Sequence, residues 1–63
     1  MDHFDMQLKI IQEHGGKISC GINWTWAKFP THSQAKAAFD ILNTDPFFEH
    51  RGLGPEDTDF RFR

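Results

Sequence analysis

The stretch FDMQLKIIQEHGGKISCGINWTWAKF, residues 4–29, carries an apolar side chain at every second position on both sides of a His-Gly-Gly sequence. Side chains of a β-strand point alternately to the two faces of a sheet, so each run predicts a strand with one buried face. We therefore expect strands over residues 4–13 and 17–27. A helix over 4–13 is the weaker alternative, because it would place Met6 and Ile10 away from the other apolar residues.

The residues between the two runs determine which faces the runs share. A two-residue turn would put the two apolar sets on opposite faces, whereas a three-residue loop keeps them on one face. Glycine readily enters the left-handed conformation that such loops commonly need. We therefore expect a hairpin loop at His14-Gly15-Gly16, with Trp24 and Trp26 on the buried face.

The apolar period changes from two to about 3.6 in the second half of the chain. Thr31 and Gln34 have the T-x-x-Q spacing of a capping box, which marks the start of a helix. The pattern predicts a helix over residues 32–43 and a short helical turn over 46–51. Alternating apolar residues at the end of the chain predict a third strand over 58–63.

These elements predict an α+β protein with the order ββαβ, forming a single domain over residues 1–63. A right-handed crossover over the helix favours a third strand beside the first, which gives a mixed sheet in the order 2-1-3 with the helix on one face. A domain of this size is marginally stable alone. Its single cysteine cannot form an internal disulfide, so we expect a homodimer.

The composition of the chain limits the cellular location and the classes of binding partner that we expect. The formal net charge of −2 gives no general attraction to phosphate or to anionic lipid. No apolar run approaches the roughly 20 residues of a membrane span, and the N-terminal MDHFDMQ lacks the layout of a signal peptide. We expect a cytoplasmic protein that has no membrane partner.

Candidate catalytic and metal-binding residues are sparse. Cys20 lies on the expected buried parity, so we interpret it as a small apolar side chain rather than a nucleophile. The four histidines match no metal-ligand spacing. One helix on three strands leaves little room for a pocket of about 300–1,000 Å³, so we expect no enzyme, no metal and no cofactor. Residues 50–55, HRGLGP, could hold an anion but lack the context of a phosphate loop, which favours a simple turn.

Two functions remain. The first is a protein–protein interaction module of the regulator or inhibitor type, because one helix does not cover every aromatic side chain and an exposed remainder would bind a partner. The residues expected to form that surface are Ile11, Trp24, Trp26, Phe47 and Phe48.

The alternative is a weak nucleic-acid-binding protein that uses basic residues of the outer sheet face and the C-terminus. The residues expected to contact phosphate are Lys9, Lys17, Arg51, Arg61 and Arg63. This function ranks second because sheets that bind single strands need exposed aromatic side chains for base stacking. Every strand aromatic is expected to face the core.

Overall fold

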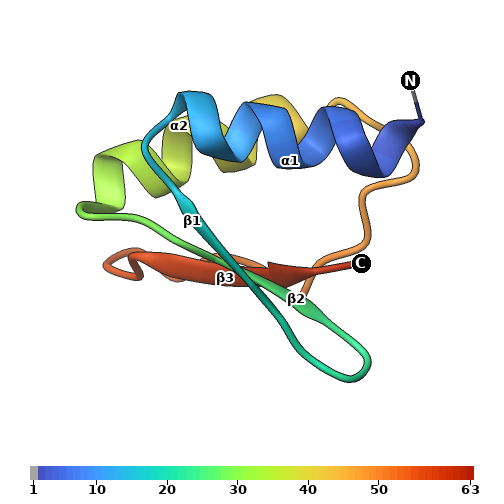
Figure 1. Cartoon of the computed structure of the whole chain (residues 1–63). Coiled ribbons are helices and arrows are strands. Elements are labelled where there is room, and N and C mark those ends of the chain that lie inside the picture. The colour runs from blue at the N-terminus through green and yellow to red at the C-terminus, as the bar shows by residue number, and fades with distance from the viewer. Residues whose placement is uncertain (1) are drawn as a thin grey trace.

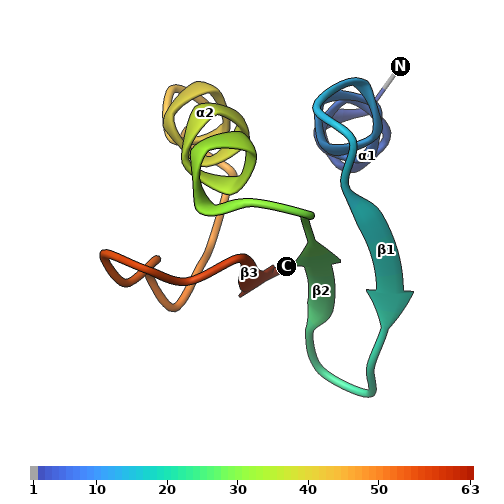
Figure 2. The ribbon, with the colours of Figure 1, turned by 90° about the vertical axis from the view of Figure 1, so that its left-hand side faces the viewer.

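The computed structural model describes residues 2–63. The elements in chain order are α1 (His3–Glu13), β1 (Lys17–Cys20), β2 (Thr25–Lys28), α2 (His32–Leu42) and β3 (Asp59–Phe62). The strands form one antiparallel sheet in the order β1-β2-β3, and both helices cover the same face of it (Figures 1 and 2). The α+β class is therefore confirmed. Within residues 2–63, neither helix is long and apolar enough to cross a membrane.

Residues 4–13 belong to α1, so the prediction of a strand there is wrong. The helix buries Gln7 and Ile11, which lie four residues apart on one face. Phe4 and Met6 are instead exposed by 40% and 42%. The alternation misled because a polar side chain, Gln7, occupies a core position and interrupts the helical period of apolar residues.

Both ends of α1 are capped by local sequence. The Asp2 carboxylate accepts a hydrogen bond from the Asp5 amide at 2.8 Å, which satisfies a free N–H of the first turn. At the other end, the Gly15 amide donates to the Gln12 carbonyl and the Gly16 amide to the Ile11 carbonyl, the two bonds of a Schellman motif. The expected hairpin loop at residues 14–16 is therefore a helix terminus.

Gly16 packs directly against the core. A Cβ atom at this position would lie 2.6 Å from Cγ2 of Ile11 and 2.6 Å from Cε2 of Phe29. Because both of these side chains are buried, they have little space into which to move. We expect Gly16→Ala to lower the free energy of unfolding by about 1–3 kcal/mol, measured by urea denaturation. Wild-type stability in this variant would contradict the close contact.

Residues 17–27 form parts of two strands rather than one. The chain reverses at Ile22 and Asn23, where the Gly21 amide donates to the Trp24 carbonyl at 2.7 Å. Because the turn has two residues, even positions of β1 share a face with odd positions of β2, as in the pair of Ile18 and Ala27.

The two-residue turn reverses which side chains of β2 face the core. Thr25 and Ala27 are buried beneath the helices. Trp24 and Trp26, on the other parity, lie on the opposite face of the sheet and are half-buried. The prediction that both tryptophans face the core is therefore wrong.

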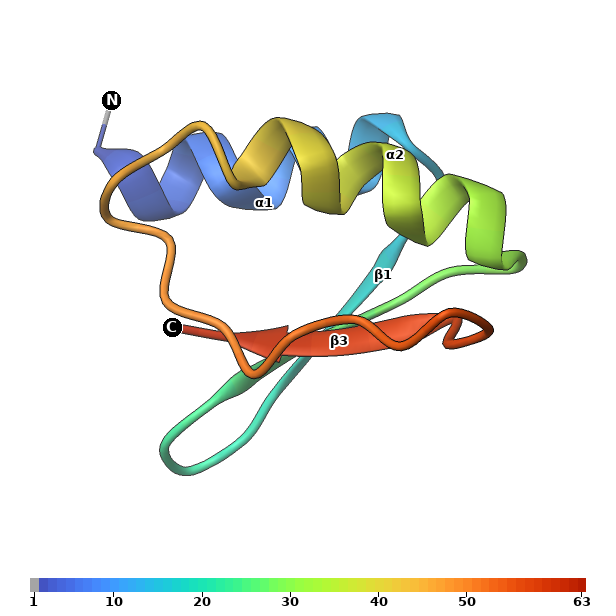
Figure 3. The ribbon, with the colours of Figure 1, turned by 180° about the vertical axis from the view of Figure 1, so that it is seen from behind.

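The predicted ββαβ order and the 2-1-3 strand order are not matched. With residues 4–13 in the helix layer, both edges of β2 are available to strands, and β2 becomes the central strand. After α2, residues 43–58 lead the chain down from the helix layer and along the sheet before β3 begins (Figure 3). β3 therefore enters antiparallel to β2, and the expected parallel crossover does not form.

The predicted helix over 32–43 is confirmed as α2, and Thr31 is its N-cap. The Thr31 hydroxyl accepts from the Gln34 amide at 3.2 Å and donates to Oε1 of Gln34 at 2.9 Å. Nε2 of Gln34 donates to the His14 carbonyl at 3.2 Å. Gln34, the second residue of this capping box, therefore also satisfies a carbonyl at the end of α1 and links the two helices.

The predicted strand over 58–63 is confirmed as β3 (Asp59–Phe62), but the helical turn predicted over 46–51 is wrong. The Arg63 amide donates to the Glu49 carbonyl at 2.9 Å, and the Arg51 amide donates to the Arg61 carbonyl at 3.3 Å. Residues 49–51 thus pair with the second edge of β3, with His50 opposite Phe62. This pairing leaves β1 as the open edge of the sheet.

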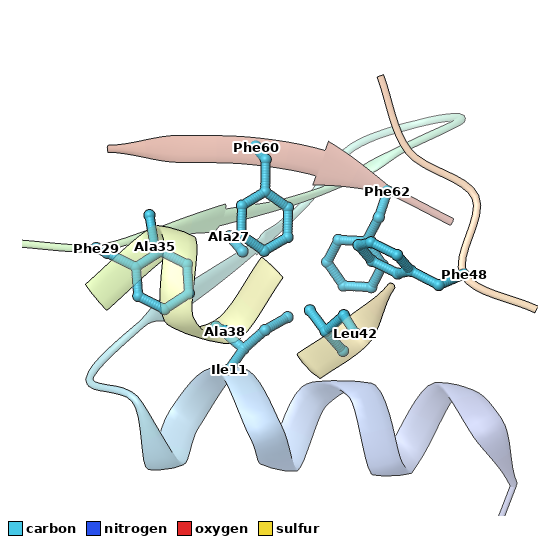
Figure 4. Packing of buried hydrophobic residues seen from close by; sticks show 9 residues of the cluster. All are labelled: Ile11, Ala27, Phe29, Ala35, Ala38, Leu42, Phe48, Phe60 and Phe62. Atoms are coloured by element: carbon cyan, nitrogen blue, oxygen red, sulfur yellow. The ribbon is translucent and has the colours of Figure 1, made fainter. Parts of the chain in front are cut away.

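The core lies between the helices and the sheet, and Phe60 is at its centre (Figure 4). The Phe60 ring centroid lies 5.6 Å from that of Phe29 and 5.2 Å from that of Phe39. These separations are typical of favourable aromatic pairs. The buried apolar residues are Ile11, Ala27, Phe29, Ala35, Ala38, Leu42, Phe48, Phe60 and Phe62.

Asp45, in the loop after α2, connects that loop to α1. Its carboxylate accepts from the Phe47 amide at 2.9 Å and from Nε2 of the buried Gln7 at 3.1 Å. Nδ1 of His3 lies 3.1 Å from each carboxylate oxygen. The Phe47 hydrogen bond is the main cause that lowers the pKa of Asp45; burial opposes it, and Gln7 and His3 add to it.

This lowered pKa predicts an acid-dependent stability. Ionised Asp45 stabilises the fold above its unfolded-state pKa near 3.8, and that contribution is lost as the pH falls through the lower folded-state value. We expect Asp45→Asn to be less stable than the wild type at neutral pH, with the difference shrinking below about pH 4. Urea denaturation at a series of pH values measures it, and a difference that persists unchanged in strong acid would contradict it.

Candidate functional site

The face of the sheet opposite the helices gathers two tryptophans and three arginines. Trp26 lies on the central strand, with Ser19 of β1 on one side and Arg61 of β3 on the other. The Arg61 guanidinium lies 5.5 Å from the centre of the Trp26 ring and 5.7 Å from that of Trp24. Because serine is small, the side of Trp26 toward β1 has no bulky neighbour in the register.

Trp24, next to the hairpin turn, is surrounded by cations. The Arg63 guanidinium lies 4.7 Å and the Arg51 guanidinium 5.1 Å from the centre of its ring. Each such contact at an exposed site contributes about 0.5–1 kcal/mol. Nε of Arg63 also donates to Oε2 of Glu49 at 3.2 Å. We name the surface formed by Trp24, Trp26, Arg51, Arg61 and Arg63 the Trp–Arg face.

Local sequence explains how this face arises. In the run DFRFR, Phe60 and Phe62 point into the core, so Arg61 and Arg63 must point outward. The two-residue turn places both tryptophans on the same outward side. Pairing of residues 49–51 with β3 then brings Arg51 beside them.

The charges of the protein are separated between its two sides. The outward register positions of the sheet carry five of the seven Lys and Arg residues of the chain and two of its nine Asp and Glu residues. This side therefore has a formal charge of +3, whereas the remaining side chains, two basic and seven acidic, have −5. The charged residues on the outer side are Lys17, Lys28, Glu49, Arg51, Asp59, Arg61 and Arg63.

The structure brings together residues from both of the expected surfaces. Trp24 and Trp26, predicted for a protein interface, lie among the arginines predicted for a phosphate-binding surface.

The predicted lysines lie on different sides of the protein. Lys17 is on the same side of the sheet as the two tryptophans, whereas Lys9 lies exposed on α1 in the helix layer. Lys28, directly opposite Lys17, was not among the predicted residues; recognising the turn at Ile22 and Asn23 would have placed it there.

The other predicted interface residues do not join the Trp–Arg face. Ile11 is fully buried and Phe48 is 7% exposed, so the prediction that they form a surface is wrong. Both side chains fill the space between the helices and the sheet. Phe47 is 64% exposed, but its ring packs at a tilt against that of His3, with ring centroids 4.4 Å apart, beside the N-terminal end of α1.

The other candidate sites, which are the cysteine, the loop over residues 50–55 and a metal site, have weaker structural support than the Trp–Arg face. Cys20 is exposed, so its predicted burial is wrong. In residues 50–55, the Gly52 amide donates to Nδ1 of His50 and the Gly54 amide to Oδ2 of Asp57, so these donors are already engaged. Across the part of the chain that the structure describes, no three His, Cys, Asp or Glu side chains are grouped to hold a metal ion.

No protein-family model, no curated protein and no solved structure matches the chain. A function is therefore argued from the chemistry and geometry of the Trp–Arg face.

Proposed function

We propose that the protein binds single-stranded nucleic acid without catalysing a reaction, and that the Trp–Arg face holds the strand. The observation that carries this proposal is the interleaving of two half-exposed tryptophans with three arginines on one sheet face. Proteins that bind single strands combine a positively charged surface along the backbone with aromatic side chains on which bases stack. The separation of charge supports the same partner, because the side opposite the helices is positive in an acidic chain.

Magnitudes favour base stacking over the arginine contacts present in the unbound protein. A base that stacks on an aromatic ring contributes about 1–3 kcal/mol, whereas an exposed guanidinium over the same ring contributes about 0.5–1 kcal/mol. A base can therefore displace one guanidinium from Trp24. The displaced arginine is then free to form a charge-assisted hydrogen bond with a phosphate of the same strand.

The face favours unpaired bases over a duplex. Trp24 and Trp26 are alternate residues of one extended segment, so their backbone positions are about 7 Å apart. Their rings can each accept a separate, splayed base, which requires an unstacked strand. In a duplex the bases are stacked on each other, and only the phosphates would reach the arginines.

Tryptophan fluorescence offers a direct test, because both tryptophans of the chain lie on this face and the chain has no tyrosine. We expect a single-stranded oligonucleotide of about 10 nucleotides to quench the emission. If each arginine neutralises one phosphate, the three arginines alone make the logarithm of the affinity fall with the logarithm of salt concentration with a slope near −2. Between about 50 and 200 mM salt the affinity then falls roughly 20-fold.

Two controls separate stacking from general attraction between opposite charges. A duplex of the same sequence should bind more weakly and quench less, because its bases are not available to the rings. Polyglutamate should compete only weakly, because it offers charge without bases. Equal affinity for polyglutamate and for the oligonucleotide, or no binding of the oligonucleotide at low salt, would contradict the proposed function.

A second candidate function is protein–protein interaction through self-association at β1. Two observations favour it: β1 is the open edge of the sheet, and Ile22, at the hairpin turn next to it, is fully exposed. An open strand edge presents unpaired backbone groups to another chain. Light scattering at high micromolar concentration tests it, and a strict monomer would contradict it.

A further inference from the structure

Two lysines lie opposite each other at the end of the sheet next to α2. Lys17 of β1 and Lys28 of β2 are direct cross-strand partners on the outer side, and both are exposed. Like charges in this position destabilise a sheet. Asp59 of β3 is the direct cross-strand partner of Lys28 on its other side, but among residues 2–63 no ion pair joins either lysine to a carboxylate. The fold thus retains a concentration of positive charge that its own acidic residues leave unpaired.

The lysines border a pocket of about 250 Å³. The rest of its lining comes from Gly15, Phe29 and Pro30, so no acidic side chain contributes to its wall. This volume is several times the roughly 30 Å³ that a water molecule occupies in the liquid. The pocket is therefore large enough for a tetrahedral anion with part of its hydration shell.

The larger pocket, of about 370 Å³ near α2, is a weaker candidate. It is bordered by Lys36 and Asp40, and Nζ of Lys36 lies 3.0 Å from the Asp40 carboxylate. The lysine there is already neutralised by its neighbour on the same helix. At the pocket between Lys17 and Lys28, by contrast, no ion pair among residues 2–63 neutralises either lysine.

We propose that the pocket between Lys17 and Lys28 binds a phosphate group. The assignment of that phosphate to the backbone of a bound strand rests on the proposed function. Trp24, Trp26 and Lys28 are successive outward residues along the same segment, with steps of about 7 Å. The phosphate site therefore lies one outward residue beyond the ring that holds the second stacked base. The bound nucleic-acid strand then runs along β2, from the hairpin turn toward α2.

Inorganic phosphate tests the pocket without any contribution from base stacking. We expect phosphate to shift the backbone amide resonances of Gly15, Lys17, Lys28 and Phe29, which line the pocket. The double variant Lys17→Gln with Lys28→Gln should lose these shifts. It should also remain folded, because the substitution removes a like-charge pair.

Oligonucleotide binding tests whether the phosphate belongs to a strand. The matched control is Lys9→Gln with Lys36→Gln, which removes the same charge from the two helices. We expect the Lys17/Lys28 variant to bind roughly tenfold more weakly than the wild type at low salt, with a salt slope smaller by about 0.7. The control variant should keep the wild-type slope.

The outcomes separate this proposal from the proposed function. If the wild type binds the oligonucleotide and the two double variants behave alike, the lysine pocket does not hold a phosphate of the strand, while the Trp–Arg face retains its function. If the wild type binds no oligonucleotide, the proposed function fails, and the inorganic phosphate titration alone decides the pocket. Absence of phosphate shifts at the lining residues would overturn the pocket in either case.

Discussion

Replacing Trp24 and Trp26 together by alanine should reduce the affinity for single-stranded oligonucleotide by at least about 30-fold. Each base stacked on an aromatic ring contributes about 1–3 kcal/mol, and the double substitution removes both rings while leaving all three arginines in place. The fold should survive, because both side chains lie outside the buried cluster. Anisotropy of a labelled oligonucleotide measures this effect, since the variant lacks tryptophan fluorescence.

Two further variants make the result specific. Trp26→Phe keeps an aromatic ring and should keep most of the affinity, whereas loss as large as in the alanine variant would indicate a role other than stacking. Phe47→Ala removes an exposed aromatic ring that packs against His3 of α1 and is not part of the Trp–Arg face, so it should leave binding unchanged. If the double alanine variant binds as tightly as the wild type, charge alone attracts the strand, and the tryptophans are not part of the site.

Phe60→Ala should leave most of the protein unfolded at room temperature. Removing a fully buried phenylalanine costs about 3–5 kcal/mol, which is comparable to the whole stability expected of a core of this size. The Phe60 ring is 2% exposed and packs on four other aromatic rings, including Phe29, Phe39 and Phe48. Because Phe29, Phe39 and Phe48 come from separate segments, removal of the Phe60 ring weakens the packing between those segments.

Circular dichroism with urea denaturation measures this loss. Phe47→Ala is the matched control, because it removes the same side chain from a position that is 64% exposed. Its effect should stay within about 0.5 kcal/mol. Phe60→Leu should remain folded and only partly destabilised, since leucine retains much of the buried apolar volume. A loss below about 1 kcal/mol in Phe60→Ala would contradict the central position of this ring.

The sequence interpretation succeeded where the signals were local. The capping box at Thr31 and Gln34 predicted α2, and the alternation around Phe60 predicted β3 and the outward direction of Arg61 and Arg63. The strand prediction over residues 4–13 is wrong, because there the apolar alternation favours a strand whereas the length of the run and its flanking residues favour a helix. Ten residues are long for a strand, and Asp2 with the two glycines supplied the cap signals of a helix.

The tryptophans illustrate how one local error changes a functional conclusion. They were predicted as interface residues because a single helix could not cover every aromatic side chain. The structure instead has two helices over the sheet, and the turn at Ile22 and Asn23 directs Trp24 and Trp26 to the other side. The objection to nucleic-acid binding, that no strand aromatic was exposed, is thereby removed.

The sequence by itself determined the capped helix after Thr31, the last strand and the outward arginines, because caps and side-chain alternation depend on residues within one or two turns of the chain. Only the tertiary structure decided which of two competing local patterns prevails over residues 4–13, that β2 is central and that Arg51 reaches Trp24. These features depend on which segments bury their apolar faces against each other. That choice is made by the free energy of the whole core rather than by any single stretch of sequence.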